Sequence, residues 1–147
     1  MKKFIIYTDG GSRGNPGRAA VGVVICNEKE QELKKFGEYI GDHLTNNEAE
    51  YQAAIIGLKK FKALFGKKLA ENTEIEIRCD SELLAKQVNG AYKVMDEKIQ
   101  KLFMELWNLR LDFKKIKFKS IPREKNKEAD RMVNEALDGA HRTQSLI

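Results

Sequence analysis

The chain has 147 residues, which is enough for one domain with a hydrophobic core and too few for two domains of ordinary size. Hydrophobic residues make up 41% and charged residues 33%, a balance typical of a soluble globular protein. No stretch is long and apolar enough to span a membrane, so we expect a cytoplasmic protein without a membrane partner. The net charge of +5 favours a polyanionic partner without requiring one.

The two cysteines, Cys26 and Cys79, fall inside predicted strands and lack the spacing of a metal site. We expect them to be buried free thiols rather than a disulfide.

The first expected strand begins with an unbroken apolar run, Phe4–Tyr7, which is typical of a central strand buried on both faces. The run leads into Asp9, and two glycines follow it. Glycines allow a bulky ligand to approach the backbone closely, although a simple polar turn explains the same letters. By composition, residues 10–17 are predicted to form a loop.

Residues 19–26 and 31–40 are predicted to be two more strands, which with the first make an antiparallel meander. A helix is then expected from Thr45 to about Phe65. Thr45 and Glu48 have the spacing of a capping box, in which each side chain accepts a hydrogen bond from the other residue's backbone N–H.

The second half of the chain alternates between helices and strands. The expected elements are a strand over 74–80, a helix over 81–88, a helix from Asp96 to about Leu109, a strand over 115–121, a helix capped by Asn126, and a loose tail over 141–147.

This order predicts an α/β fold: a mixed five-stranded sheet, antiparallel in its first three strands and then parallel, with helices on both faces. A single domain is expected over residues 1–140, followed by a flexible tail. Asp9 and Asp80 would end neighbouring parallel strands, where the ligands of open α/β sheets bind.

Four carboxylates from separate segments can converge in this layout: Asp9, a glutamate of the first long helix, Asp80 and Asp130. Together they would repel one another, and divalent cations would cancel that cost. Oxygen ligands without histidine or cysteine suit Mg²⁺ or Mn²⁺ rather than zinc. Such clusters hold two ions about 3.5–4 Å apart for phosphoryl transfer. For Asp80 and Asp130, helix capping or helix-dipole duty is the competing explanation.

Four segments together resemble the ordered motif set of type 1 ribonuclease H. They are Tyr7–Gly17 (YTDGGSRGNPG), Thr45–Tyr51 (TNNEAEY), Cys79–Ser81 (CDS) and Pro122–Asp130 (PREKNKEAD). The resemblance covers essentially the whole chain. It implies a ribonuclease H-like fold and a metal-dependent endonuclease, a hydrolase that cuts the RNA strand of RNA/DNA hybrids and leaves 5′-phosphate and 3′-hydroxyl ends.

By that resemblance, Asp9, Glu50, Asp80 and Asp130 are the catalytic metal ligands. Glu50 rather than Glu48 matches the family motif, since Glu48 occupies the capping-box position.

Two departures from the family pattern are visible. Many members carry a basic protrusion that grips hybrids, whereas here residues 89–93 lead almost directly to the next helix. Many bacterial members also place a histidine before the last catalytic aspartate. Arg123 is the nearest catalytic substitute in this chain, and a solvent-facing loop arginine without a catalytic part is its alternative.

Substrate contacts are expected from amides that can bind RNA 2′-hydroxyls, from hydroxyls that can hold a phosphate, and from lysines that attract the backbone. Turn and capping duties compete for the amides and hydroxyls. Seven basic residues lie between Phe113 and Lys127 against one acid. The candidates are Asn15, Thr45, Asn46, Asn47, Ser81, Lys117, Lys119 and Asn126.

The sequence therefore favours a monomeric ribonuclease H that uses two Mg²⁺ or Mn²⁺ ions on RNA/DNA hybrids, with RNA duplexes as a second candidate substrate. A binding module that kept the fold is disfavoured because all four acidic positions are intact. A polynucleotidyl transferase or integrase relative is disfavoured by the compact single domain and by the Thr45–Asn47 motif.

Overall fold

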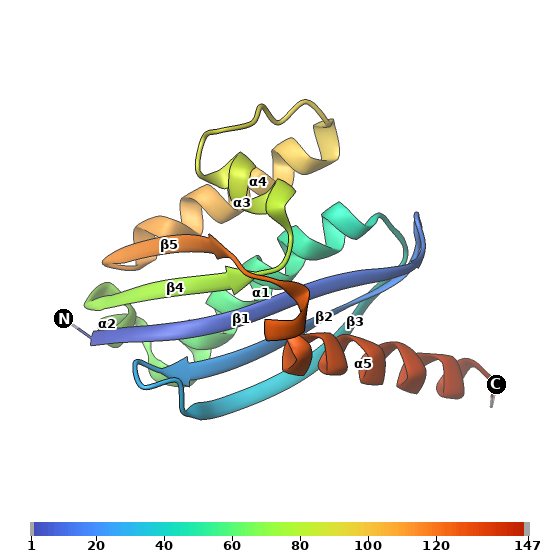
Figure 1. Cartoon of the computed structure of the whole chain (residues 1–147), viewed down its shortest axis with the longest axis horizontal. Helices are drawn as coiled ribbons and strands as arrows, with labels where there is room; N and C mark the ends of the chain where they lie inside the picture. The colour runs from blue at the N-terminus through green and yellow to red at the C-terminus, as the bar shows by residue number, and fades with distance from the viewer. Residues whose placement is uncertain (1, 146–147) are drawn as a thin grey trace.

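The computed structural model describes residues 2–145, with side-chain environments for residues 2–140 (Figure 1). The strands are β1 (Lys2–Gly14), β2 (Gly17–Asn27), β3 (Glu32–Leu44), β4 (Thr73–Cys79) and β5 (Lys115–Ser120). The α-helices are α1 (Asn46–Phe65), α2 (Lys67–Glu71), α3 (Glu82–Val88), α4 (Glu97–Leu109) and α5 (Lys127–Ser145). Single 3₁₀ turns cover Arg110–Asp112 and Arg123–Lys125.

The five strands form one sheet in the order β3-β2-β1-β4-β5. β1 and β2 are antiparallel, as are β2 and β3, whereas β4 runs parallel to β1 and to β5. The predicted mixed sheet is confirmed. Tyr7 pairs with Arg78, so Asp9 and Asp80 each follow two residues later along neighbouring strands.

Helices cover both faces of the sheet (Figure 1). One face carries the main core, in which apolar residues of α1 and α4 cluster with alternate strand residues such as Ile6, Ile75 and Ile77. Within this core α4 packs against α1. On the opposite face α5 packs over β1, β2 and β3. Its Ala129 belongs to a smaller cluster with Ile5 and the facing residues of β2.

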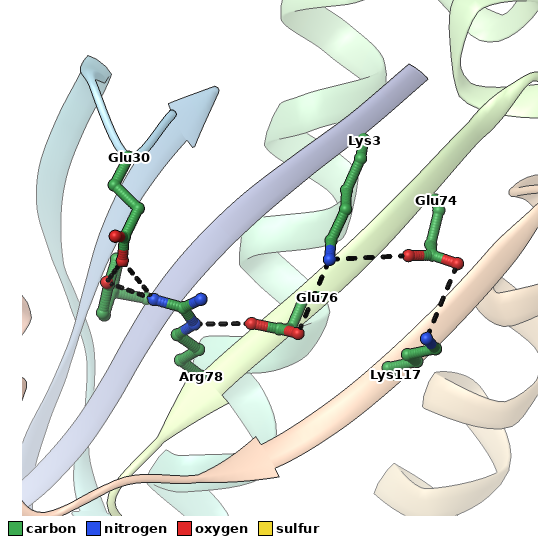
Figure 2. Close-up of polar contacts among 7 residues, drawn as sticks. Lys3, Glu30, Glu74, Glu76, Arg78 and Lys117 are labelled. Atoms are coloured by element: carbon green, nitrogen blue, oxygen red, sulfur yellow. Dashed lines mark hydrogen bonds and ion pairs between the residues drawn. The ribbon is translucent and has the colours of Figure 1, made fainter. Parts of the chain in front are cut away.

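The charged residues of β4 alternate with its core residues and therefore lie on the α5 side of the sheet, where they form a polar network (Figure 2). Arg78 Nε donates to Glu76 Oε2 at 2.6 Å, and Arg78 Nη1 donates to the Tyr7 hydroxyl at 2.7 Å. Glu74 lies between Lys3 and Lys117, with both N–O distances at 3.9 Å. These pairs allow polar side chains to line a partly buried strand surface.

The loop expected over residues 10–17 is wrong: β1 continues to Gly14 and pairs with β2 until Gly14 faces Gly17. Within this stretch Gly10 allows the close approach of α1, whereas Gly14 adopts a positive φ of 89° at the turn into β2. α2 was not predicted, and β3 runs to Leu44 instead of ending at residue 40. α5 reaches Ser145, inside the expected tail, and residues 146–147 lie outside the described part of the chain.

The helix starts follow the sequence signals closely. Thr45 and Glu48 form the expected capping box, and Ser81 and Asp96 cap α3 and α4 through their side chains. The cap expected at Asn126 is wrong, because its side-chain oxygen is buried without a hydrogen-bond partner among the described residues.

The two cysteines also agree with the prediction from the sequence. Cys26 and Cys79 are free and buried, as predicted. Within residues 2–145, no helix has the length and apolarity needed to cross a membrane.

Candidate active site

A cleft of about 380 Å³ opens where the ends of β1 and β4 meet the first turns of α1 and α5. Its lining includes the four candidate carboxylates, which come from strands and helices, and the candidate arginine on the turn before α5. They are Asp9, Glu50, Asp80, Asp130 and Arg123.

Three carboxylates converge at the base of this cleft. One ligand oxygen from each of Asp9, Glu50 and Asp80 lies within 4.8 Å of the other two. Asp9 projects from β1, Asp80 follows the last residue of β4, and Glu50 comes from the second turn of α1. Three separate elements therefore bring oxygen donors to one point, which is what a site for a hard divalent cation requires.

Glu50 reaches this point because α1 lies directly against β1. The backbone N–H of Gly10 donates to Glu50 Oε1 at 2.8 Å. A Cβ at position 10 would lie 2.2 Å from the carbonyl carbon of Ala49, so only glycine fits there without displacing the helix. Glu48 completes the capping box on the preceding turn, which agrees with the sequence-based distinction between the two glutamates.

Burial and mutual repulsion make the cluster costly without a cation. Asp9 and Glu50 are each only 7% exposed. Burial, followed by the charge of Glu50, raises the pKa of Asp9 from its ordinary 3.8 to about 10. Burial also raises the pKa of Glu50 to about 7, against the lowering effect of hydrogen bonds from Asp9 and the Gly10 N–H. Burial therefore favours keeping a proton on the Asp9–Glu50 pair near neutral pH when no cation is bound.

Asp130 lies at the rim rather than in the converging group. It sits in the first turn of α5, is exposed, and adds a repulsive charge that raises the pKa of Asp9. The prediction that all four carboxylates share one cleft thus agrees with the geometry, with three of them in the tight cluster.

Arg123 lies on the same cleft wall, in the turn before α5. Its positive charge lowers the pKa of Glu50, although burial outweighs this effect. A guanidinium near the acidic cluster is placed to hold a phosphate group.

The expected substrate-binding amides and hydroxyls surround the start of α1 and α3. Asn46 and Ser81 line the cleft. Asn46 accepts from the Ser12 N–H at 2.9 Å, and its own N–H donates to Asn15 Oδ1 at 3.0 Å. Thr45 accepts the capping hydrogen bond. Hydrogen bonds of this kind fix the end of β1 and the turn after it against α1.

The other six candidates do not line the cleft, and Asn47, Lys117 and Lys119 are among them. Asn47 Oδ1 is buried without a partner in the described part of the chain. Lys117 and Lys119 are exposed on β5, where Lys117 pairs with Glu74 of the polar network (Figure 2). On the neighbouring strand β4, Lys117 is paired with Glu76 and Lys119 with Arg78.

Asn126 is only 2% exposed, which contradicts its expected role as a nucleic-acid contact. Its side chain points into the protein, where it donates to the backbone carbonyl of Thr8 and to Asp80.

Sequence reasoning missed Arg13, which also lines the cleft. Its guanidinium lies 2.8 Å from Asp138 and donates to Asn134 at 3.3 Å, so it joins the end of β1 to α5. The signal is present in the sequence, as the one basic residue of the YTDGGSRGNPG segment. The glycines around it favour a loop, and a loop arginine gives no sign of a partner on a distant helix.

Comparison with known proteins agrees with this geometry. A family model described as reverse transcriptase-like matches residues 7–136. Ribonuclease HI of Halobacterium salinarum is 40% identical over 134 residues, which cover 91% of this chain and 64% of the relative. The bifunctional protein Rv2228c of Mycobacterium tuberculosis is 35% identical over 138 residues, which cover 94% of this chain and 36% of that protein. The chain thus spans between about a third and two thirds of these curated relatives.

Solved structures extend the comparison to the fold. LC11-RNase H1, solved in complex with an RNA/DNA hybrid, superposes with a TM-score of 0.88 at 45% identity. The match covers 93% of this chain and 98% of that one. The N-terminal RNase H domain of Rv2228c gives a TM-score of 0.86 at 34% identity and covers 98% of this chain and 99% of the solved chain. The chain therefore belongs to the type 1 ribonuclease H family.

Proposed function

We propose that this protein is a metal-dependent endoribonuclease that hydrolyses the RNA strand of RNA/DNA hybrids and leaves 5′-phosphate and 3′-hydroxyl ends. The observation that carries the proposal is the convergence of Asp9, Glu50 and Asp80 within 4.8 Å at the base of an open cleft. The relative LC11-RNase H1 was solved with an RNA/DNA hybrid, which supports the same substrate class here.

The donor set fits Mg²⁺, or Mn²⁺ in its place. All three converging groups offer carboxylate oxygens, and Glu50 Oε2 is buried with no hydrogen-bond partner in the described structure. An orphaned buried oxygen beside two further carboxylates is what a hard cation would satisfy. We assign Asp9, Glu50 and Asp80 as principal ligands of two ions, with Asp130 completing the set from the rim. Bound divalent cations would stabilise the attacking and leaving oxygens of the phosphodiester.

The protein's own groups would bind and orient the substrate around that centre. Arg123 can hold a phosphate through its guanidinium fork. Asn46 and Asn15 can exchange hydrogen bonds with RNA 2′-hydroxyls, which distinguish RNA from DNA. Thr45 and Ser81 use their oxygens as helix caps, and each hydroxyl retains a hydrogen that can bind a DNA phosphate. The same proposal includes Asn47 as a minor-groove contact.

The lysines of β5, including Lys117 and Lys119, would attract the hybrid at longer range. Their positive charges would neutralise backbone phosphates, and this attraction does not depend on the base sequence. We further propose that the protein acts as a monomer in the cytoplasm, with residues 1–140 as one catalytic domain. RNA duplexes are a second candidate substrate.

The test is cleavage of end-labelled RNA/DNA hybrid, RNA duplex and DNA duplex by the purified protein, in Mg²⁺ and separately in Mn²⁺. Cleavage confined to the RNA strand of the hybrid, abolished by EDTA, supports the proposal. Absence of hybrid cleavage in both metals, by a folded protein, would refute it and favour a binding module.

A further inference from the structure

Asn126 connects three of the four segments that carry the acidic residues. It lies between the 3₁₀ turn Arg123–Lys125 and α5. It is only 2% exposed, and it carries no charge. Its Nδ2 donates to the backbone carbonyl of Thr8 at 2.9 Å and lies 3.4 Å from Asp80 Oδ2. Its own backbone carbonyl accepts from the Asp130 N–H at 3.1 Å.

Each of these contacts acts next to a proposed metal ligand. Thr8 directly precedes Asp9 on β1, so the first bond fixes the backbone from which Asp9 projects. The second contact bears on the Asp80 carboxylate itself. The third begins the hydrogen-bond ladder of α5 and sets the position of Asp130 in its first turn. Glu50 is held separately, by the Gly10 N–H.

The chemistry of the amide suits this position. A primary amide carries two N–H hydrogens, so one nitrogen can serve the Thr8 carbonyl and the Asp80 carboxylate together. It does so without adding charge to a cluster that already repels itself. An aspartate of the same shape would donate neither bond and would add a further negative charge, whereas a lysine would compete with the cation.

We propose that Asn126 is a positioning residue, which orients the Asp80 carboxylate relative to Asp9 and α5, and is not a contact for nucleic acid. The proposal rests on the proposed metal-dependent nuclease function. Outer partners of metal ligands of this kind typically change metal affinity or activity by about 10-fold to 100-fold when removed.

The test uses Asn126→Ala and Asn126→Ser in the full chain. Serine can cap a helix, which keeps the start of α5 stable, but its single donor cannot serve both acceptors. The matched control is Asn72→Ala. Asn72 also donates from its side chain to a backbone carbonyl, that of Lys68 at 3.1 Å, but it precedes β4 at the end opposite Asp80.

Three quantities are measured for folded protein: Mn²⁺ affinity without substrate by titration calorimetry, hybrid affinity in EDTA, and kcat on saturating hybrid. Both Asn126 variants should weaken Mn²⁺ binding and lower kcat by about 10-fold to 100-fold, with hybrid affinity within about twofold of wild type. Asn72→Ala should change none of them.

Two results would overturn the proposal. Weaker hybrid binding with unchanged Mn²⁺ affinity would make Asn126 a substrate contact. Lower thermal stability with unchanged Mn²⁺ affinity and kcat would make it a purely structural residue. Because Mn²⁺ affinity is measured without substrate, the role of Asn126 is decided even if wild type fails to cleave hybrids, so the two proposals fail separately.

Discussion

Replacing Asp9 with asparagine should stabilise the metal-free protein while abolishing its proposed catalysis. Asp9 is 7% exposed, and burial beside Glu50 raises its pKa from 3.8 to about 10. A carboxyl whose pKa is higher in the folded than in the unfolded state must take up a proton on folding. The free energy of unfolding therefore falls as pH rises from about 4 toward the folded pKa.

The size of the effect follows from the pH interval. Each pH unit above the unfolded pKa costs the wild type about 1.4 kcal/mol, so the penalty at pH 7 is about 4 kcal/mol at most, and at pH 5 about 2 kcal/mol. Asparagine is neutral in both states and has no such penalty. Its amide can also donate a hydrogen bond to the Glu50 carboxylate.

The assay is urea unfolding of wild type and Asp9→Asn in EDTA at pH 5 and pH 7. The variant should be the more stable protein, and its advantage should grow with pH. Asp112→Asn is the matched control, because Asp112 forms an ion pair with Lys62 at 2.7 Å outside the cleft and that variant should lose at most about 1 kcal/mol. An Asp9→Asn advantage that is absent, or equal at both pH values, would show that Asp9 does not hold the proton.

Three further predictions concern catalysis and binding. Glu50→Gln should abolish hybrid cleavage, whereas Glu48→Gln should keep it because glutamine also completes a capping box; cleavage rates and thermal melts check both, and the reverse pattern would contradict the assignment. Arg123→Ala should lower kcat about 10-fold to 100-fold, with Arg123→Lys between it and wild type, and equal kcat in all three proteins would remove Arg123 from the mechanism. Replacing Lys117 and Lys119 with alanine should flatten the log–log salt dependence of hybrid binding by about one unit for each phosphate that is no longer neutralised; an unchanged slope would place binding elsewhere.

Local signals in the sequence predicted the element types well. Side-chain periodicity identified β4 from its alternating Ile75, Ile77 and Cys79, and the Thr45–Glu48 pair marked the start of α1. Such signals are reliable because the backbone groups at a helix start must find partners within a few residues. The order of strands and helices is compatible with only a few sheet topologies, and the mixed sheet is one of them.

Interactions between distant segments were not predictable in the same way. The composition around Gly10 predicted a loop, but the real constraint on this glycine is the α1 backbone 40 positions along the chain. Gly22 on β2 has the same relation to α5, since a Cβ there would lie 2.0 Å from the carbonyl oxygen of Ala129. The sequence alone does not reveal whether a glycine is needed for an unusual backbone conformation or for the close approach of another helix or strand.

Asn126 illustrates the same limit for a polar residue. Its position before a helix predicted a cap, and its motif implied a substrate contact. The packing of α5 against the sheet turns its side chain inward to Thr8 and Asp80 instead. The partner of a side chain depends on the tertiary environment, which local sequence does not encode.

Cation binding requires the carboxylates to lie close together, whereas their repulsion lowers the stability of the fold. The hydrogen bonds from Gly10 and Asn126 counter this repulsion. Repulsion among Asp9, Glu50 and Asp80 favours separating β1, α1 and the end of β4, which lowers the stability of the metal-free protein. The Gly10 N–H donates to Glu50 and the Asn126 amide donates to Asp80, so two neutral donors oppose the separation of the carboxylates. Preorganisation of this kind means that cation binding need not reorganise the backbone, and free energy otherwise needed to order the site appears as metal affinity. Loss of either neutral donor should therefore weaken cation binding more than it weakens the fold.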